Sequence, residues 1–500
     1  MTFLDLFIVA AYLAGVIAAG AWFSKRQKTT AQYFLGGRSV PWWAISASIV
    51  ATETSTITFI SVPGIAYARG GNFTFLQLAF GYVLGRVVIS ILFLPSYFSG
   101  ELLTVYQLLT KRFGGVVKGL AASLFVTMRT IGDGIRLLLT ALVLAAVAAA
   151  FAPTAAPETV VFVSVVALGL VMVVFTLWGG MEAVIWIEVV QLGIYVGGAV
   201  AAAIVLTGLI PGGLAGALDV AERFGKVTLF DTSLAGHGSY TTLWAGLIGG
   251  AFLTMSTHGT DQYLVQRYLC TDRPSRAAAA LLVSGVVVLV QFAGFLTIGL
   301  LLFAFYKPYE LASYASGSPA APFNRVDAVF PDFITHHLPH GLAGLVVAAI
   351  LAAAMSSSLN SIAATAVNDL YRPLVPNRED GHYLALGKRL TALAGAAQIL
   401  VALLVRRSPT SALDKALAVA SLLNGPVLGV FLIGAFTKRA GRRAALAGMG
   451  AGIVVAFSVW RFTPVAWPWY AAIGSLTTLA VGSVVGLFEP DAHGAAPEAA

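Results

Sequence analysis

The sequence has 500 residues, of which 58% are hydrophobic and 10% are charged, and its formal net charge is +8. Soluble proteins carry about 25% charged residues, so this composition excludes a water-soluble globule and predicts a polytopic membrane protein. The single cysteine, Cys270, excludes an internal disulfide framework and a multi-cysteine metal site.

Apolar segments of about 20 residues, the length that crosses a hydrocarbon core of ~30 Å, recur along the whole chain. The first starts near residue 3 without a basic segment before it, so it is predicted to be a retained span and not a cleaved signal peptide. The sequence predicts about 13 spans in all. They cover residues 3–23, 42–66, 74–97, 119–150, 158–178, 183–208, 242–264, 278–306, 341–366, 389–405, 413–436, 444–461 and 468–487.

Basic residues indicate the orientation of these spans. With the N-terminus outside, about 18 of the 30 Lys and Arg residues, Arg267 among them, fall in cytoplasmic connections. We therefore expect the N-terminus outside and the C-terminus in the cytoplasm. The compact loops and short tails favour a multi-pass protein of a plasma membrane, and in particular of a bacterial inner membrane.

Polar residues interrupt the second predicted span between Ser48 and Thr58, shortly before Pro63. An unwound stretch here would expose carbonyl oxygens that can coordinate a cation, and irregular backbone at membrane depth is tolerated where it lines a cavity. The alternative is a bent but continuous helix whose hydroxyls bond to carbonyls four residues earlier.

The ninth predicted span contains a second group of possible cation ligands. Ala353, Ser356 and Ser357 have the spacing i, i+3, i+4, so a carbonyl and two hydroxyls can converge on one helix face. Such hard oxygen ligands suit a small alkali cation. The same residues could instead form a packing seam of small side chains, and this segment alone leaves both interpretations open.

A third polar stretch runs from Thr254 to Tyr263 in the seventh predicted span. A polar break five spans after the first is what an inverted five-helix repeat would produce. A lone histidine such as His258 is more often a hydrogen-bonded packing residue than a ligand. The sequence has no hydrolase, NTPase or dinucleotide-binding motif and no basic nucleic-acid stripe, so we expect neither an enzyme nor a nucleic-acid partner.

The segment from Gly341 to Tyr371 resembles the signature of the sodium/solute symporter family, which includes sodium/glucose, proline, pantothenate and iodide transporters. The segments Trp42–Ser48, Gly179–Gln191 and Asp261–Arg267 are also similar to that family. The resemblance implies an all-α polytopic membrane protein with about 13 transmembrane helices and a LeuT-like core of two inverted five-helix repeats.

This fold implies one transmembrane transporter domain over residues 1–500. Its expected parts are an extra N-terminal helix and cytoplasmic loop (1–40), the first inverted repeat (41–208), the second inverted repeat (241–437), two C-terminal helices (438–487) and a disordered tail (488–500).

The resemblance also implies a sodium site built from two carbonyls of the first broken helix and a carbonyl plus two hydroxyls of the signature helix. By position its ligands are Ala51, Thr54, Ala353, Ser356 and Ser357. The signature is about three residues shorter than the common pattern, and an ungapped register would put Ala353 and Ala354 at the hydroxyl positions. We prefer the gapped register because the upstream segment matches and three residues are close to one helical turn.

Some members of the family hold a second sodium with an acid in the sixth span, where Glu188 stands here in place of the common Asp. The span positions that would bind the solute are Glu53, Thr58, Gln77, Thr254, Thr257 and His258. The sugar-binding members of the family supply polar residues from several spans. Here the eighth span has no lysine and no glutamine lies near Leu417, so the resemblance disfavours a hexose as the solute. Glu53 could instead be an ion-pair partner of an arginine within the spans, namely Arg86, Arg129 or Arg136.

The leading hypothesis is a secondary active transporter that couples Na+ to the symport of a small polar organic solute by alternating access. Its partners would be the solute, sodium and the lipid bilayer, and we expect a monomer. One alternative keeps the fold and uses a proton carried by Glu53 or Glu188. The other is a solute sensor or channel without coupled transport.

Overall fold

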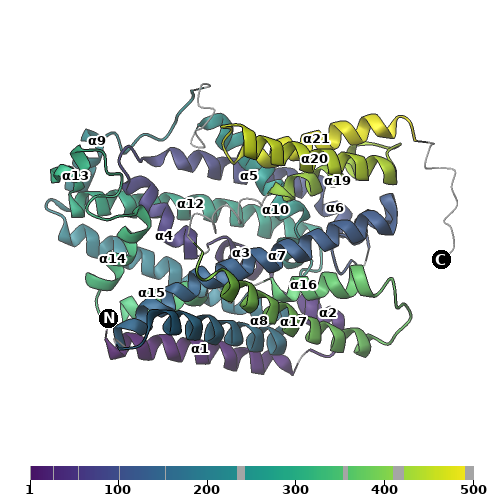
Figure 1. The fold of residues 1–500 in the computed structure, drawn as a ribbon, viewed down its shortest axis with the longest axis horizontal. Coiled ribbons are helices and arrows are strands. Elements are labelled where there is room, and N and C mark those ends of the chain that lie inside the picture. The colour runs from purple at the N-terminus through teal and green to yellow at the C-terminus, as the bar shows by residue number, and fades with distance from the viewer. Residues whose placement is uncertain are drawn as a thin grey trace.

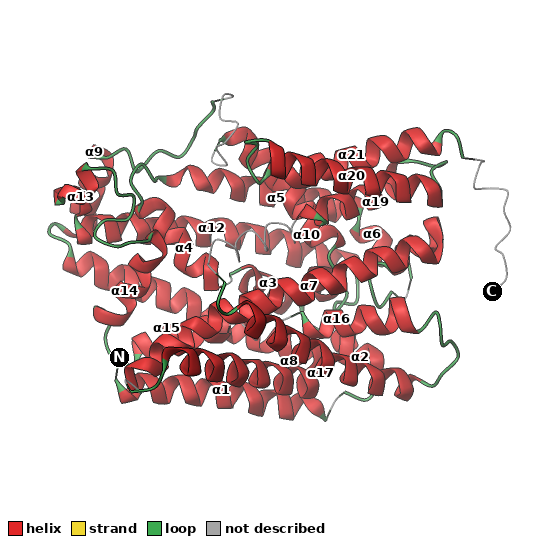
Figure 2. Ribbon diagram, viewed as in Figure 1, coloured by secondary structure: helices red, strands yellow, loops and turns green. Residues whose placement is uncertain are grey.

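The computed structural model describes residues 2–25, 27–54, 56–100, 102–151, 154–233, 242–352, 358–408 and 422–489. Every regular element in these ranges is a helix, and none is a strand (Figure 2). Most of the long helices run along the long axis of the molecule (Figure 1). The predicted all-α fold class is therefore confirmed.

Within the described ranges, 8 helices are long and apolar enough to cross a membrane. They are α1 (Phe3–Ser24), α5 (Leu76–Leu92), α7 (Gln107–Phe151), α8 (Pro157–Leu209), α12 (Pro274–Tyr306), α17 (Asp380–Val405), α20 (Arg442–Phe462) and α21 (Trp469–Gly486). A bent pair, α3 (Trp42–Glu53) and α4 (Thr56–Tyr67), forms a ninth candidate. Two shorter apolar helices are α15 (Leu342–Ala352) and α19 (Asn424–Phe436).

The remaining helices of the described ranges are short and lie between or beside these spans. They are α2 (Thr30–Leu35), α6 (Leu94–Tyr97), α9 (Gly213–Arg223), α10 (Gly250–Thr260), α11 (Gln262–Tyr268), α13 (Ala312–Ala315), α14 (Val329–His336) and α16 (Leu359–Thr365), with π-helical segments at Ala245–Gly249 and Ala366–Tyr371.

Helix α8 has 53 residues, so it would be about 80 Å long if straight, which is more than twice the ~30 Å thickness of the hydrocarbon core. It bends at Gly180, whose φ is +58°, and this position separates the predicted spans 158–178 and 183–208. A Cβ atom at Gly180 would lie 2.8 Å from the carbonyl oxygen of Tyr33, so both the bend and the close approach favour glycine. The total number of spans and the division into repeats stay predictions.

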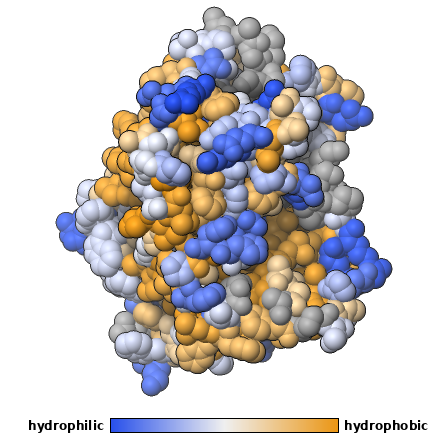
Figure 3. Space-filling view, turned by 90° about the vertical axis from the view of Figure 1, so that its left-hand side faces the viewer, coloured by the Kyte–Doolittle hydropathy of each residue, from blue (hydrophilic) through white to orange (hydrophobic). Residues whose placement is uncertain are grey.

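The molecule has two different ends (Figure 1). Helices α9, α13 and α14 lie at the end where α1 starts, here called the α9 end, and α2 lies at the other end, where α21 finishes. Figure 3 looks onto the α9 end and shows hydrophilic residues scattered among hydrophobic ones. Along the spans, exposed apolar residues recur four apart, as at Val196, Val200 and Ile204 of α8. This spacing gives α8 an outward apolar face, as expected for contact with lipid.

Both predicted polar breaks are present. The chain bends by 62° between α3 and α4. Asp261 has an extended backbone between α10 and α11, and its side chain accepts a hydrogen bond from the Tyr263 amide at 2.9 Å. Thr52 and Thr54 also donate to carbonyls four residues earlier, as the continuous-helix alternative proposed, but α3 still ends at Glu53.

Glycines on α5 set the position of α10. A Cβ atom at Gly81 would overlap the Gly246 carbonyl oxygen, and one at Gly85 would lie 2.6 Å from that of Ala251. Only glycine allows this approach of the two backbones. The polar residues of α10 are thereby brought against α5 and the break that follows α3.

Candidate functional site

The proposed sodium ligands on the second span lie at the end of α3. The last hydrogen bond of this helix joins the Thr54 amide to the Val50 carbonyl at 2.9 Å. Ala51 is therefore in the last turn, where carbonyls lack partners within the helix and the helix dipole is negative. This geometry suits a cation. Ala353, Ser356 and Ser357 lie outside the described residues.

Gln291 of α12 lies next to this break, although nothing in its sequence context singles it out. The Thr54 hydroxyl oxygen lies 2.7 Å from the Val50 carbonyl oxygen and 2.9 Å from the Gln291 side-chain oxygen, which share its single proton. The amide nitrogen of Gln291 is buried and has no partner among the described residues. Gln291 therefore places a polar side chain of α12 against the end of α3.

Glu188, the candidate for a second ion, is buried in a network that joins α8, α3 and α11. Its carboxylate accepts hydrogen bonds from Arg267 Nη2 at 2.6 Å, from Thr52 Oγ1 at 3.1 Å and from the Ser48 hydroxyl. Arg267 Nε also donates to Ser48 Oγ at 3.0 Å. The guanidinium of Arg267 thus supplies the positive charge next to Glu188.

The side chain of Arg267 is 0% exposed, so it lies in the protein interior and not in the exposed connection that was predicted. The predicted span ended at residue 264, whereas α11 continues to Tyr268 inside the protein. The charge count that predicted the orientation therefore includes one arginine that belongs to the protein interior.

Glu53 and His258, two of the predicted solute-binding residues, form a cluster with Arg86 of α5. Glu53 Oε1 lies 2.6 Å from His258 Nε2, and its other carboxylate oxygen pairs with Arg86 Nη2. His258 Nδ1 lies 2.7 Å from the Tyr268 hydroxyl. With Nε2 donating to Glu53, Nδ1 accepts from Tyr268. Of the three arginines proposed as partners of Glu53, the structure selects Arg86.

The other predicted solute-binding residues are more dispersed. Thr58 donates to the Glu53 carbonyl at 3.3 Å and so stays near this cluster. Gln77 is held by backbone groups, donating to Thr74 at 3.1 Å and accepting from the Asp231 amide at 3.2 Å. Thr254 packs against Gly85 of α5, within 2.9 Å of the Cβ position there.

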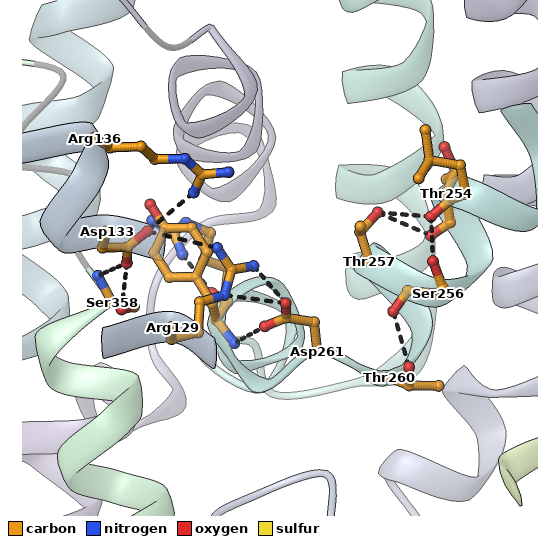
Figure 4. Close-up of polar contacts among 12 residues, drawn as sticks. Arg129, Asp133, Arg136, Thr254, Ser256, Thr257, Thr260, Asp261 and Ser358 are labelled. Atoms are coloured by element: carbon orange, nitrogen blue, oxygen red, sulfur yellow. Dashed lines mark hydrogen bonds and ion pairs between the residues drawn. The ribbon is translucent and has the colours of Figure 1, made fainter. Parts of the chain in front are cut away.

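Thr257 faces a different space, a pocket of about 140 Å³ between α7, the α10–α11 break and α19. Its polar lining residues are Tyr106, Arg129, Asp133, Arg136, Thr257, Thr260, Asp261 and Asn424. Figure 4 shows that two arginines and two aspartates from α7 and the break face one another here. Arg129 Nε donates to Asp261 Oδ2 at 3.1 Å, and Arg136 Nη1 donates to Asp133 Oδ1 at 3.0 Å.

The ring of Tyr263 connects this pocket with the Glu188 network. The Arg129 guanidinium carbon lies 4.5 Å from the ring centroid, and that of Arg267 lies 4.6 Å from it. Cations close to an aromatic face are attracted to its quadrupole. Arg129 in the pocket and Arg267 in the Glu188 network therefore contact the same aromatic ring.

The sequence interpretation treated the α7 charges only as possible partners of Glu53 and missed the pocket that they line. A signal was present, because Arg129, Asp133 and Arg136 all lie within the predicted span 119–150, and charges at membrane depth are costly unless they have a function. Their pairing with Asp261 and with each other could not be read from spacing alone.

The chain matches the model of the sodium:solute symporter family over residues 33–452. It is 30% identical over 499 residues to the sodium/sialic acid symporter of Proteus mirabilis, covering 98% of this chain and 96% of that protein. It is 29% identical over 487 residues to that of Aliivibrio fischeri, covering 96% and 92%. The human sodium/iodide cotransporter is 27% identical over 443 residues, covering 87% of this chain and 65% of that protein.

The fold is also that of a solved relative. A Na+-coupled sialic acid symporter, solved in a substrate-bound outward-open state, superposes with a TM-score of 0.85 at 29% identity and covers 98% of both chains. This match confirms the LeuT-like fold class. The family and these relatives are transporters, and the chain is a multi-pass membrane protein. It belongs to the sodium:solute symporter family, and its function is the sodium-coupled symport of a small solute.

Proposed function

We propose that the solute is a small polyhydroxylated carboxylic acid and that it binds in the pocket between α7, α10 and α19. The observation that carries this proposal is the pair of arginines in the pocket at membrane depth. The Arg136 side chain is 49% exposed and binds Asp133 through one nitrogen, so it has donors left for a carboxylate. Relatives that transport sialic acid, an acidic sugar, support the same class of solute.

The pocket also offers hydroxyl and amide groups that suit a polyhydroxylated molecule. Thr257, Thr260 and Asn424 line it beside the charged residues. At about 140 Å³ it is close in volume to an engineered cavity that holds benzene. A larger sugar acid therefore requires the pocket to widen. A solute carboxylate that binds Arg136 in place of Asp133 would break the Arg136–Asp133 ion pair and so help the pocket to widen.

Sodium, in this proposal, binds at the end of α3 through the Ala51 and Thr54 carbonyls, together with Ala353, Ser356 and Ser357. The Glu53–Arg86–His258 cluster links the end of α3 to α5 and α10 beside this site, and Thr58, Gln77 and Thr254 complete the solute site as it opens. A second sodium at Glu188 would have to displace Arg267. Coupling requires only that each ligand raises the affinity for the other.

We also propose that the protein acts as a monomer in a bacterial inner membrane, with the α9 end outside, and has no enzymatic activity. The excess of basic residues on the opposite side supports this orientation. The variants Ser313→Cys in α13 and Lys25→Cys after α1, each labelled with a thiol reagent from one side of the membrane, would test this orientation. Labelling of position 313 from the cytoplasm would contradict the proposed orientation.

Uptake into proteoliposomes tests the proposed function. An inward sodium gradient should drive accumulation of an acidic sugar, and the amide of that sugar should compete poorly. Arg136→Gln should raise the KM for the acid at least about tenfold, since a charged hydrogen bond contributes roughly 1.5–3 kcal/mol. Arg223→Gln, at an exposed arginine on α9, is the matched control. Equal affinity for acid and amide would contradict the solute class, and uptake driven by acid pH without sodium would favour proton coupling.

A further inference from the structure

Lys226 follows α9 at the α9 end of the molecule and is only 1% exposed. Its Nζ atom lies within hydrogen-bond distance of four backbone carbonyls, at 2.7 Å from Ala66, 3.1 Å from Tyr67, 2.9 Å from Ala68 and 3.2 Å from Gly71. No carboxylate of the described residues lies within ion-pair distance of it. A buried lysine is normally paired with an acid, so this arrangement is unusual.

The four carbonyls belong to the C-terminal end of α4 and the turn that follows it. Carbonyls at a helix C-terminus lack partners within the helix and carry the negative end of its dipole, so they attract a cation. The Lys226 nitrogen also lies 3.9 Å from the centroid of the Phe303 ring at the end of α12. The four carbonyls and this ring form a cage for a primary ammonium group, here called the ammonium cage.

The ammonium cage lies at one end of α4, and the proposed sodium site lies at the other. Helix α4 begins at Thr56, two residues after Thr54, so its orientation determines where the break after α3 is placed. Along its length α4 packs closely on α12, because a Cβ at Gly299 would overlap the Pro63 carbonyl oxygen. Its far end is also joined to the loop before α14, where the Arg69 amide donates to the Pro319 carbonyl at 3.1 Å.

We propose that Lys226 is a positioning residue for sodium binding: by filling the ammonium cage it fixes the outer end of α4 and thereby the carbonyls at the α3–α4 break. This role rests on the proposed sodium site, because α4 leads directly out of it. Lys226 itself touches neither ion nor solute. Removing the Lys226 side chain should therefore change sodium affinity by altering the position of α4.

The test uses Lys226→Ala in the full-length protein, with and without added methylammonium, at constant pH and ionic strength. Without the amine, the sodium concentration for half-maximal uptake should rise about fivefold or more, within the range of ordinary coupling energies, while the maximal rate changes little. Amide hydrogen exchange in residues 64–72 should become faster. Methylammonium should reverse both effects because it can fill the cage, and tetramethylammonium, which has no N–H group, should not.

Arg223→Ala is the matched control. It also removes one positive charge, only three residues before Lys226, but the Arg223 side chain is exposed. If Lys226→Ala does not fold, Lys226→Met, which keeps the apolar stem, is measured in the same way without the amine. Unchanged exchange in residues 64–72, or faster exchange with unchanged sodium affinity, would overturn the proposal. Absence of sodium dependence in the parent protein would instead contradict the sodium site, and the exchange data would still report on the cage.

Discussion

Arg267 on α11 and Glu188 on α8 form an ion pair at 2.6 Å in which neither side chain is accessible to solvent. Two charges at this depth are tolerated because every nitrogen of the Arg267 guanidinium and both oxygens of Glu188 have a hydrogen-bond partner. Through Ser48, which donates to Glu188 and accepts from Arg267, the pair also joins α3 to α11. A relative movement of α3 and α11 therefore has to break or move this pair.

Removing one member of the pair should cost much more stability than removing both. Glu188→Leu leaves a buried arginine without a counterion and should lower the free energy of unfolding by about 3–5 kcal/mol. The double variant Glu188→Leu/Arg267→Met has no uncompensated charge and should recover most of this loss. Thermal unfolding of detergent-purified protein measures both. A double variant as unstable as the sum of the single variants would show that the two residues do not interact in the native state.

The register of the signature helix is tested by Ser357. In the preferred register its hydroxyl is a sodium ligand, so Ser357→Ala should abolish sodium-dependent uptake and the sodium-specific rise in melting temperature. A ligand present at a hundredfold excess over Kd stabilises the native state by about 2.7 kcal/mol, and this gain should disappear. Ser361→Ala, at a buried serine of α16 four residues later in the sequence, is the control. Full uptake and unchanged sodium affinity in Ser357→Ala would favour the ungapped register.

The places where the membrane helices break could be predicted from the sequence, because hydroxyl and charged residues clustered at membrane depth are costly unless they line a site. The partners that meet across the breaks could not. Glu53 had three candidate arginines, and the choice of Arg86 depends on how α3 and α5 both pack against α12, where Gly285 makes room for the Arg86 side chain. This packing depends on the arrangement of helices in space, which hydropathy and spacing do not contain.

The burial of Arg267 was missed for a related reason. An arginine at the end of a predicted span is ordinarily assigned to the cytoplasmic side, and its partner Glu188 lies 79 residues away in the sequence. Likewise, the ammonium cage joins residues 155–160 positions apart. Both arrangements depend on long-range packing, whereas a polytopic membrane protein could be predicted from composition, and the LeuT-like fold and the sodium coupling from the resemblance of local motifs to the sodium/solute symporter family.

Asp5 should stabilise the contact between α1 and α15. Its carboxylate accepts hydrogen bonds from the amides of Gly341 at 2.7 Å and Gly344 at 2.9 Å, at the N-terminus of α15. A Cβ at Gly344 would lie 2.5 Å from the Asp5 Cα, so the two helices touch here. Asp5→Ala removes the acceptor and the charge at a helix N-terminus and should lower the free energy of unfolding by about 1–2 kcal/mol. Unchanged thermal stability would contradict this role.

Lys226 should make the stability of the protein depend on pH. Burial lowers the pKa of its ammonium from 10.5 to about 7, so the contacts of the ammonium cage offset only part of the lost hydration and hold the charged form below about pH 7. Between these two pH values the unfolded chain holds the proton and the folded protein does not, so the contribution of Lys226 to stability is complete above pH 10.5 and is lost as the pH falls through about 7. The melting temperature should therefore rise with pH across this window.

Lys226→Met has no titrating group at this position, so its melting temperature should rise less steeply with pH than that of the parent protein. The slopes of melting temperature against pH should differ between the two proteins only from about pH 7 to pH 10.5. Outside this window Lys226 has the same protonation in the folded and unfolded states, so it contributes no slope. Arg223→Met, which removes an exposed charge on α9, should keep the parental slope. Parallel profiles for Lys226→Met and the parent would mean that the pKa of Lys226 is the same in the folded and unfolded chain.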